Sequence, residues 1–304
     1  MIELVNKETN RQYLLEPPDQ SKGYKKAFYG ANFEEYDTSG FDECFPTIAE
    51  SPYPTEDESD QNYDLVLPDH GELWSQVWEY GINDNELVLR AKGIRLNYLF
   101  TKRITLDKNK IIIHYSLYNQ SQTPFCYIWS AHPLLRVQPH SKILLSEDID
   151  RVLLNWASDE RLGSLGDVLD WPNLASPNGT VDYSVVQDRS LGVALKCFTS
   201  ILEDGFAGIY FRESDETLMF KFDTKEVPYL GLWLCYGGWP VNSAEKHFTV
   251  GLEPCSGRPD SLQESVKRRE CSEIEGETTK EWSLELGLWE GQVPATELKR
   301  NDSS

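Results

Sequence analysis

Apolar residues that recur at every second position are the feature that most constrains the fold of this chain. Leu96, Tyr98 and Phe100 follow this period, and after a turn it continues from residue 111 to residue 117. Successive side chains of a strand point to opposite faces, so the two segments predict a long antiparallel hairpin. Short segments with the same character continue to residue 288. We therefore expect an all-β chain built as a large antiparallel sandwich.

These segments are spread over the whole length of the chain, without a linker long enough to divide it. Two short helices are indicated, around residues 159–169 and from Asp260 to about residue 270, with Leu262 and Val266 facing inward. Large all-β domains reach a length of 304 residues. We expect a single domain spanning residues 1–304.

The charge of the chain excludes several classes of partner. Fifty acidic residues against 29 basic ones give a net charge of -21, which repels nucleic-acid phosphates and anionic lipid. The N-terminal residues show no apolar signal core, and no apolar run is long enough to span a membrane. We expect a cytoplasmic protein that binds neither nucleic acid nor membranes.

Six cysteines are present, without a C-x-x-C pair. This spacing excludes a zinc ribbon and a dithiol redox motif. Most of the cysteines stand among apolar residues, so we interpret them as reduced, buried side chains.

The segment 247–257 places a carboxylate at a strand end. Phe248, Val250 and Leu252 alternate on one side, and Glu253 follows Gly251 on the other, before Pro254. A proline can end a strand or mark its edge. A carboxylate with open space beside it suits a catalytic base, but the segment alone favours an ordinary solvated strand end.

Two histidines stand in similar places. His132 ends the strand 125–133, and His70 follows the strand 63–67 within the polar cluster Asp69, His70 and Glu72. A carboxylate and an imidazole can divide the base and acid roles, so Glu253, His132 and His70 form a candidate acid–base set. The alternatives are a core histidine at 132 and a turn residue at 70. His247, about 20 Å from Glu253 along an extended strand, is interpreted as structural.

Other chemistries have weaker signals. His70 and Glu72 are spaced for two metal ligands, but the His-x-His clustering of many metal sites is missing, so we expect no metal. No G-x-S-x-G motif and no glycine-rich phosphate loop are present. Trp74, Trp233 and Trp239 lie near polar clusters or glycine-rich turns, where a ring can pack against the C–H face of a sugar. Most of the nine tryptophans must nevertheless belong to the core.

Three motifs in this order resemble the galactose mutarotase-like (aldose 1-epimerase) family. They are residues 69–74 with Trp78, residues 129–133, and residues 251–255. The tracts 41–48 and 229–240 are similar to a less characterised bacterial branch of that family. The resemblance implies a large antiparallel β-supersandwich with a sugar in an open groove. It also implies that no cofactor is needed, because only protons move, and that the protein is a monomer or homodimer.

The resemblance further implies a role for each member of the acid–base set. Glu253 would take the proton from the anomeric hydroxyl, and His132 would protonate the ring oxygen, which opens the ring. His70 would bind and polarise the sugar near the ring oxygen. Rotation about the C1–C2 bond and closure would then give the other anomer.

The residues expected to bind the sugar hydroxyls differ from those of the family pattern. The family's N-terminal site arginine has no counterpart in 41–45, and its later site aspartate has none in 232–235. Asp42, Glu43 and Trp233 are the expected replacements, and Trp74 and Trp239 complete the predicted substrate-binding set. The alternatives are a sugar-binding protein without turnover and a hexose-phosphate epimerase. The latter needs cations such as Arg90, Arg95 and Lys102 to converge on the phosphate.

Overall fold

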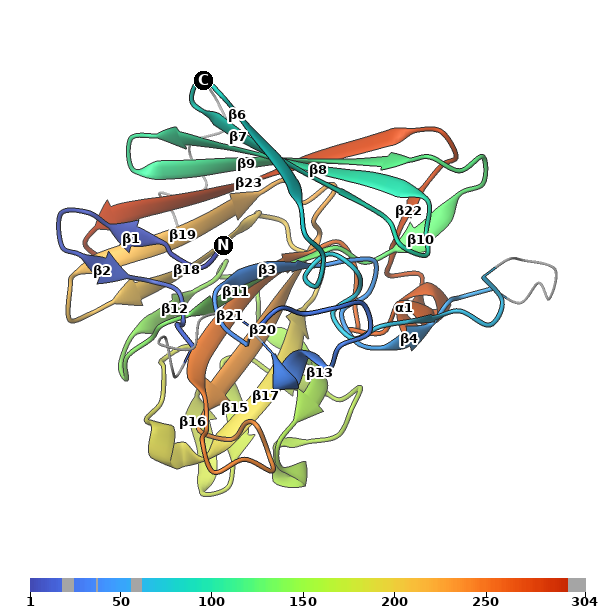
Figure 1. Cartoon of the computed structure of the whole chain (residues 1–304). Coiled ribbons are helices and arrows are strands. Elements are labelled where there is room, and N and C mark those ends of the chain that lie inside the picture. The colour runs from blue at the N-terminus through green and yellow to red at the C-terminus, as the bar shows by residue number, and fades with distance from the viewer. Residues whose placement is uncertain (18–24, 37, 56–61, 295–304) are drawn as a thin grey trace.

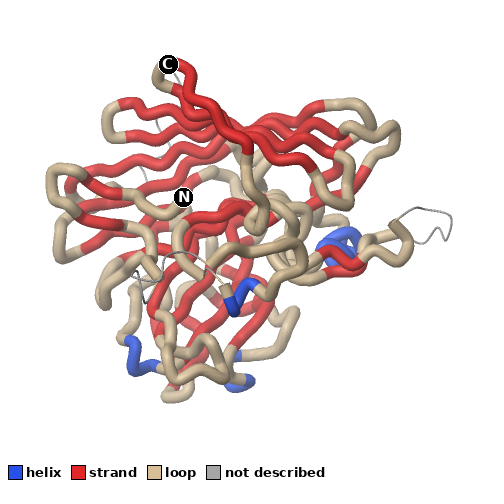
Figure 2. The backbone as a smooth tube through the Cα atoms, in the orientation of Figure 1, coloured by secondary structure: helices blue, strands red, loops and turns tan. Residues whose placement is uncertain are grey.

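The computed structural model describes residues 1–17, 25–36, 38–55 and 62–294. Two large antiparallel sheets lie one above the other and form most of the molecule (Figures 1 and 2). The predicted all-β antiparallel sandwich is confirmed. Among the described residues, no helix is long and apolar enough to cross a membrane.

The larger sheet has eight strands, and the predicted hairpin lies within it as β8 and β9. Its strands, in spatial order, are β12 (Lys142–Leu144), β18 (Phe206–Phe211), β19 (Glu216–Phe222), β23 (Thr279–Glu290), β9 (Lys110–Asn119), β8 (Tyr98–Asp107), β7 (Glu86–Lys92) and β6 (Glu79–Asn83). The β8–β9 register runs from Tyr98 opposite Asn119 to Asp107 opposite Lys110. The hairpin prediction is therefore confirmed.

The smaller sheet has seven strands and contains the segments that end in Glu253 and His132. Its strands, in spatial order, are β14 (Val168–Asp170), β13 (Arg151–Ala157), β17 (Val193–Thr199), β20 (Tyr229–Tyr236), β21 (Phe248–Cys255), β11 (Ser130–Leu135) and β3 (Phe41–Cys44). Four strand pairs lie outside the two sheets: β1 (Val5–Asn6) with β2 (Arg11–Gln12), β4 (Ser51–Pro52) with β5 (Val66–Leu67), β10 (Phe125–Tyr127) with β22 (Ser272–Ile274), and β15 (Asn173–Ser176) with β16 (Gly179–Asp182).

The two helix predictions had different outcomes. The helix α1 (Leu262–Arg268) forms as predicted, but its N-cap is Ser261, whose hydroxyl accepts from the backbone amide of Glu264. The helix expected at 159–169 is wrong: only a 3-10 turn, η3 (Glu160–Leu162), forms before β14. Gly163, at a φ of 125°, ends the turn, because that backbone conformation is incompatible with a continuing helix.

The prolines that follow His132 and Glu253 do not end their strands, as the sequence had suggested. Pro133 lies inside β11 and Pro254 inside β21. These strands pair at Ser130–Cys255 and again from Leu134–Gly251 onward. Proline cannot donate to a ladder, and the regular pairing is interrupted between these points, beside His132 and Glu253.

The inner faces of the two sheets form the hydrophobic core. Trp129, Tyr115 and Trp282 pack together there, with ring centroids 4.8 to 5.5 Å apart. All six cysteines are free, four of them buried and Cys126 and Cys271 half-buried, in agreement with the sequence.

A buried ion pair joins the two sheets within this core. Glu43 of β3 accepts from Lys102 of β8 at 2.7 Å and from the Tyr115 hydroxyl at 3.1 Å. The side chains of Glu43 and Lys102 are only 5% and 8% exposed. Glu43 therefore points into the core, in contrast to its predicted role in substrate binding.

We predict that Lys102→Met destabilises the fold by about 3–5 kcal/mol, because it leaves the Glu43 carboxylate buried without a partner. Unfolding in urea gives the free energy directly. The double variant Lys102→Met/Glu43→Met should recover most of this loss, since it removes both charges. Equal losses in the single and double variants would contradict a paired role for Glu43.

Candidate functional site

The outer face of the seven-stranded sheet, which points away from the other sheet, carries the polar residues of the site. Along β21, Val250 and Leu252 face the core, and Gly251 and Glu253 face outward. Register pairing places Gly231 beside Glu253 and Trp233 beside Gly251, and it places Lys196 of β17 beside Trp233. The alternation in each strand therefore turns these side chains to one common surface.

A cavity of about 180 Å³ opens on this outer face. Drug-sized pockets usually measure about 300–1,000 Å³, so this one suits a single small ring. The side chains that carry its chemistry are Glu253, His132, His70, Asp69, Lys196 and Asp260. All three residues of the predicted acid–base set thus meet in one cavity.

The loop that carries His70 is held by hydrogen bonds to its surroundings. The His70 amide donates to the Ile48 carbonyl, and Gly71 has a φ of 70°. A Cβ atom at Gly71 would lie 2.0 Å from the Phe45 carbonyl oxygen, so only glycine fits this approach. Glu72 follows, and its carboxylate accepts from the backbone amides of residues 94 and 95 at 2.9 Å. Glu72 is therefore a structural anchor for the loop, and it does not line the cavity.

Glu253 is fully buried and presents one free carboxylate oxygen. Its Oε2 atom is paired with the Lys196 ammonium group. Among the described residues, its Oε1 atom has no hydrogen-bond donor, and it lies 3.8 Å from Nε2 of His132. Gly251 leaves the required space, because a Cβ atom there would lie 2.8 Å from Oε1. The free oxygen and the imidazole nitrogen therefore lie close together in the lining of one cavity.

The two histidines have different electrostatic surroundings. Burial lowers the pKa of His132 well below its ordinary value, and His70 and Lys196 add to the effect. His70 instead has a carboxylate beside it, since its Nδ1 lies 3.0 Å from Oδ1 of Asp69. Burial alone would raise the pKa of Asp69, but contact with His70 lowers it below the usual value. Phe33 stacks on the His70 ring with centroids 3.8 Å apart and holds it in place.

Lys196 and Asp260 belong to the site but were absent from the predicted set. Lys196 is 5% exposed, and its Nζ lies 3.9 Å from Oδ1 of Asp260. Burial raises the pKa of Asp260 to about 6, against the opposing effect of Lys196. One signal was available in the sequence: Lys196 interrupts the apolar run of the strand 193–199. Asp260 had no comparable signal, because it was interpreted as a helix cap.

Of the five predicted substrate-binding residues, two line the cavity and three lie outside its lining. Trp233 and Trp239 line the cavity, with ring centroids 5.9 Å apart and an interplanar angle of 87°. Asp42 pairs in register with His132 and shares its face, but it lies outside the cavity lining, as does Glu43. Trp74 also lies outside: its indole N–H donates to the Asp69 carbonyl and supports the loop.

His247 and Trp156 complete the apolar side of the cavity. His247 packs edge-on against Trp239 with centroids 4.9 Å apart. It contributes to the wall of the cavity, whereas the sequence indicated a structural residue. Its pKa is lowered by burial, so it adds no positive charge near neutral pH.

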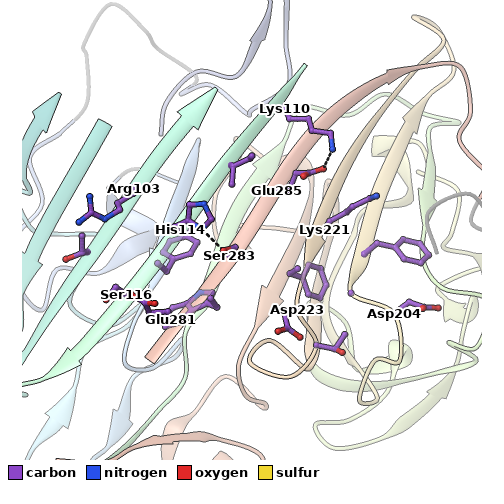
Figure 3. Close-up of a pocket in the computed structure, with 18 of the residues that line it drawn as sticks. Arg103, Lys110, His114, Ser116, Asp204, Lys221, Asp223, Glu281, Ser283 and Glu285 are labelled. Atoms are coloured by element: carbon purple, nitrogen blue, oxygen red, sulfur yellow. Dashed lines mark hydrogen bonds and ion pairs between the residues drawn. The ribbon is translucent and has the colours of Figure 1, made fainter. Parts of the chain in front are cut away.

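A wider hollow of about 1,030 Å³ lies on the outer face of the eight-stranded sheet. Figure 3 shows that Lys110 reaches Glu285 and His114 reaches Ser283 across neighbouring strands. Its charged groups are spread over an open sheet, and none of the predicted site residues line it. The three residues of the candidate acid–base set therefore all line the smaller cavity.

No group of three or more histidine, cysteine or acidic side chains is arranged to hold a metal ion in the described part of the chain. The imidazoles and carboxylates of the cavity instead contact one another, Lys196 or Phe33. The arrangement suits proton transfer to and from a small ligand.

Comparison with sequences found no matching family model and no matching curated protein. Comparison with solved structures found clear matches at low identity. They include Slr1438 from Synechocystis sp. PCC 6803 (14% identity, TM-score 0.63, 91% of this chain and 84% of that chain). They also include a galactose mutarotase-like protein from Lactobacillus casei ATCC 334, with 14% identity and a TM-score of 0.61 over 95% of this chain and 93% of that chain. A galactose mutarotase related enzyme from Lactobacillus acidophilus matches with 12% identity and a TM-score of 0.60 over 94% of this chain and 91% of that chain.

These matches cover 91% to 95% of this chain and 84% to 93% of the matched chains. At such identities the likeness concerns the fold. The chain has the galactose mutarotase-like fold.

Proposed function

We propose that this protein is an aldose 1-epimerase-like isomerase (mutarotase) that interconverts the α and β anomers of a small free sugar. The observation that carries the proposal is the convergence of the free Glu253 oxygen and the His132 nitrogen, 3.8 Å apart, inside a cavity of monosaccharide size. Solved structures that share this fold include proteins named as galactose mutarotase-like, which supports the same reaction class.

The geometry fits ring opening, because the anomeric hydroxyl oxygen and the ring oxygen of the sugar are both bonded to C1, and a base and an acid that lie close together can reach both. Glu253 takes the proton of the anomeric hydroxyl, the C1–O1 bond becomes a carbonyl, and the bond from C1 to the ring oxygen breaks. His132 delivers a proton to the ring oxygen, and His70 lies beside it, with ring centroids 5.0 Å apart. Rotation about C1–C2 and the reverse steps give the other anomer. Each positioned group contributes about 10²–10⁴-fold to the rate.

The tryptophans supply the apolar part of sugar recognition. Trp233 and Trp239 are partly exposed at the cavity, where a ring can cover the C–H face of a sugar. The site needs no cofactor for this reaction, and the six free cysteines fit a reducing cytoplasm. We therefore place the protein in cytoplasmic carbohydrate metabolism.

A phosphorylated substrate is disfavoured by the charges of the cavity. Among its described lining residues, Lys196 is the only lysine or arginine, and it is already paired with Glu253. Lys102 is held by Glu43 in the core, and neither Arg90 nor Arg95 lines the cavity. Among the described residues, no group of cations lines the cavity to receive a phosphate.

A sugar-binding protein without turnover is the second candidate. One observation favours it: Oε2 of Glu253 is already paired with the Lys196 ammonium group, which leaves a single carboxylate oxygen for the ligand. Saturable sugar binding combined with an uncatalysed rate of anomer exchange would identify this function.

We predict that Glu253→Gln and His132→Ala each reduce anomer exchange by about 10²-fold or more, because each removes a proton-transferring group. NMR saturation exchange across a panel of neutral aldoses measures the rate. Glu43→Gln, which changes a buried carboxylate outside the cavity, serves as the control and should keep the wild-type rate. Exchange at the wild-type rate in both site variants, with folding intact by thermal unfolding, would reject the proposal.

The pH dependence follows from the lowered pKa of His132. Because burial disfavours the imidazolium, the acid form of His132 is lost as the pH rises, and this happens below its ordinary value of 6.5. We predict that the basic limb of the kcat/KM profile has its midpoint below pH 6.5. A basic limb that begins only above neutral pH would contradict His132 as the proton donor.

A further inference from the structure

A buried lysine contacts the proposed base from a strand that is not its neighbour. Lys196 lies on β17 and Glu253 on β21, and β20 separates the two strands. The ammonium group is paired with Oε2 of Glu253 and lies 3.9 Å from Oδ1 of Asp260. A lysine that is 5% exposed is costly to bury unless it is paired with an anion.

The pair meets because one residue between the two strands has no side chain. Gly231 of β20 is the register partner of Glu253. A Cβ atom at this position would lie 3.3 Å from Oε2 of Glu253 and 3.3 Å from Cε of Lys196. The lysine side chain therefore crosses β20 over Gly231, and any larger residue would stand between the two charges.

The result is a carboxylate whose two oxygens have separate partners. Lys196 takes Oε2, and Oε1 remains without a donor among the described residues, directed at the cavity near His132. Asp260, whose Oδ2 accepts a hydrogen bond of 2.6 Å from Asn155, places its Oδ1 atom 3.9 Å from the same ammonium group.

We propose that Lys196 is the positioning residue of Glu253: it supplies the positive charge beside the buried carboxylate and binds Oε2, so that Oε1 faces the substrate. This inference rests on the proposed function, in which Glu253 is the base. In this role Lys196 acts through Glu253, because its ammonium group is paired with Oε2 of Glu253 and lies near Asp260.

The other charges around Glu253 cannot replace the ammonium group. His132 of β11 is disfavoured as a cation by burial. The loop residue His70 lies 3.0 Å from the carboxylate of Asp69, and Asp260 after β21 is negative when ionised. Two further titratable neighbours are Cys44 of β3 and Cys255 of β21, which burial keeps as neutral thiols because it raises the pKa of each. The β20 residue opposite Glu253 is a glycine.

The test compares the kcat/KM profiles of wild type, Lys196→Met, Lys196→Arg and Lys102→Met against pH. Without the ammonium group, burial favours the neutral acid form of Glu253, so the base is lost at a higher pH. We expect the acid limb of Lys196→Met to move upward by about 1–3 pH units. The basic limb should also move upward, because Lys196 lowers the pKa of His132.

Two matched variants separate positioning from a merely structural role. Lys196→Arg keeps the positive charge and should retain the acid limb near that of wild type. Lys102→Met removes another buried lysine from an ion pair with a glutamate, but outside the cavity. It should lose stability and keep both limbs. An unchanged acid limb in folded Lys196→Met, or the same shift in Lys102→Met, would overturn the inference.

A second variant covers the case in which Lys196→Met does not fold. Gly231→Val keeps every charge and places a side chain between Lys196 and Glu253, at the point where a Cβ atom alone lies 3.3 Å from both. Its acid limb should also move upward, and a wild-type profile would overturn the inference.

An activity-independent measurement separates this inference from the proposed function. ¹³C NMR of the Glu253 carboxyl, assigned by its loss in Glu253→Gln, follows ionisation directly. The titration midpoint should rise in Lys196→Met, even if no sugar of the panel is turned over. Absence of turnover in wild type would reject the mutarotase proposal alone, and an unmoved Glu253 midpoint would reject the role of Lys196.

Discussion

The pleat of the seven-stranded sheet is the constraint on which the rest of the structure depends. Neighbouring residues of a strand point to opposite faces, so β21 supplies Val250 and Leu252 to the core and Gly251 and Glu253 to the cavity. A shift of the register by one residue would exchange these faces. The hydrophobic core and the site are therefore set by the same pairing, and the core's close packing holds the site rigid.

Two buried lysine–glutamate pairs show how position decides the use of the same chemistry. The Glu43–Lys102 pair lies between the sheets, and Tyr115 donates to the same oxygen of Glu43 as Lys102 does. The Glu253–Lys196 pair lies on the outer face, and one oxygen of Glu253 is left free beside His132. Burial alone thus does not identify a functional carboxylate. An unpartnered oxygen that faces a cavity is the more specific sign.

The alternating pattern was enough to predict the sandwich, the β8–β9 hairpin and the side of β21 on which Glu253 lies. The pattern could not predict which face of β3 carries Glu43. This strand has four residues, three of them are buried, and both of its faces are therefore largely covered. The helix expected at 159–169 was wrong because Gly163 interrupts it, which shows that local propensity is weaker than backbone geometry at a single residue.

The sequence by itself determined the fold class and named Glu253, His132 and His70 as groups able to transfer protons, because period and residue type are local properties. The tertiary structure alone decided that these groups share one cavity and that Lys196 and Asp260 join them. Lys196 and Glu253 are 57 positions apart in the chain and sit on strands that do not pair. Their contact depends on the order of the strands and on the glycine at position 231, and neither can be predicted from the residue pattern of β17 or β21.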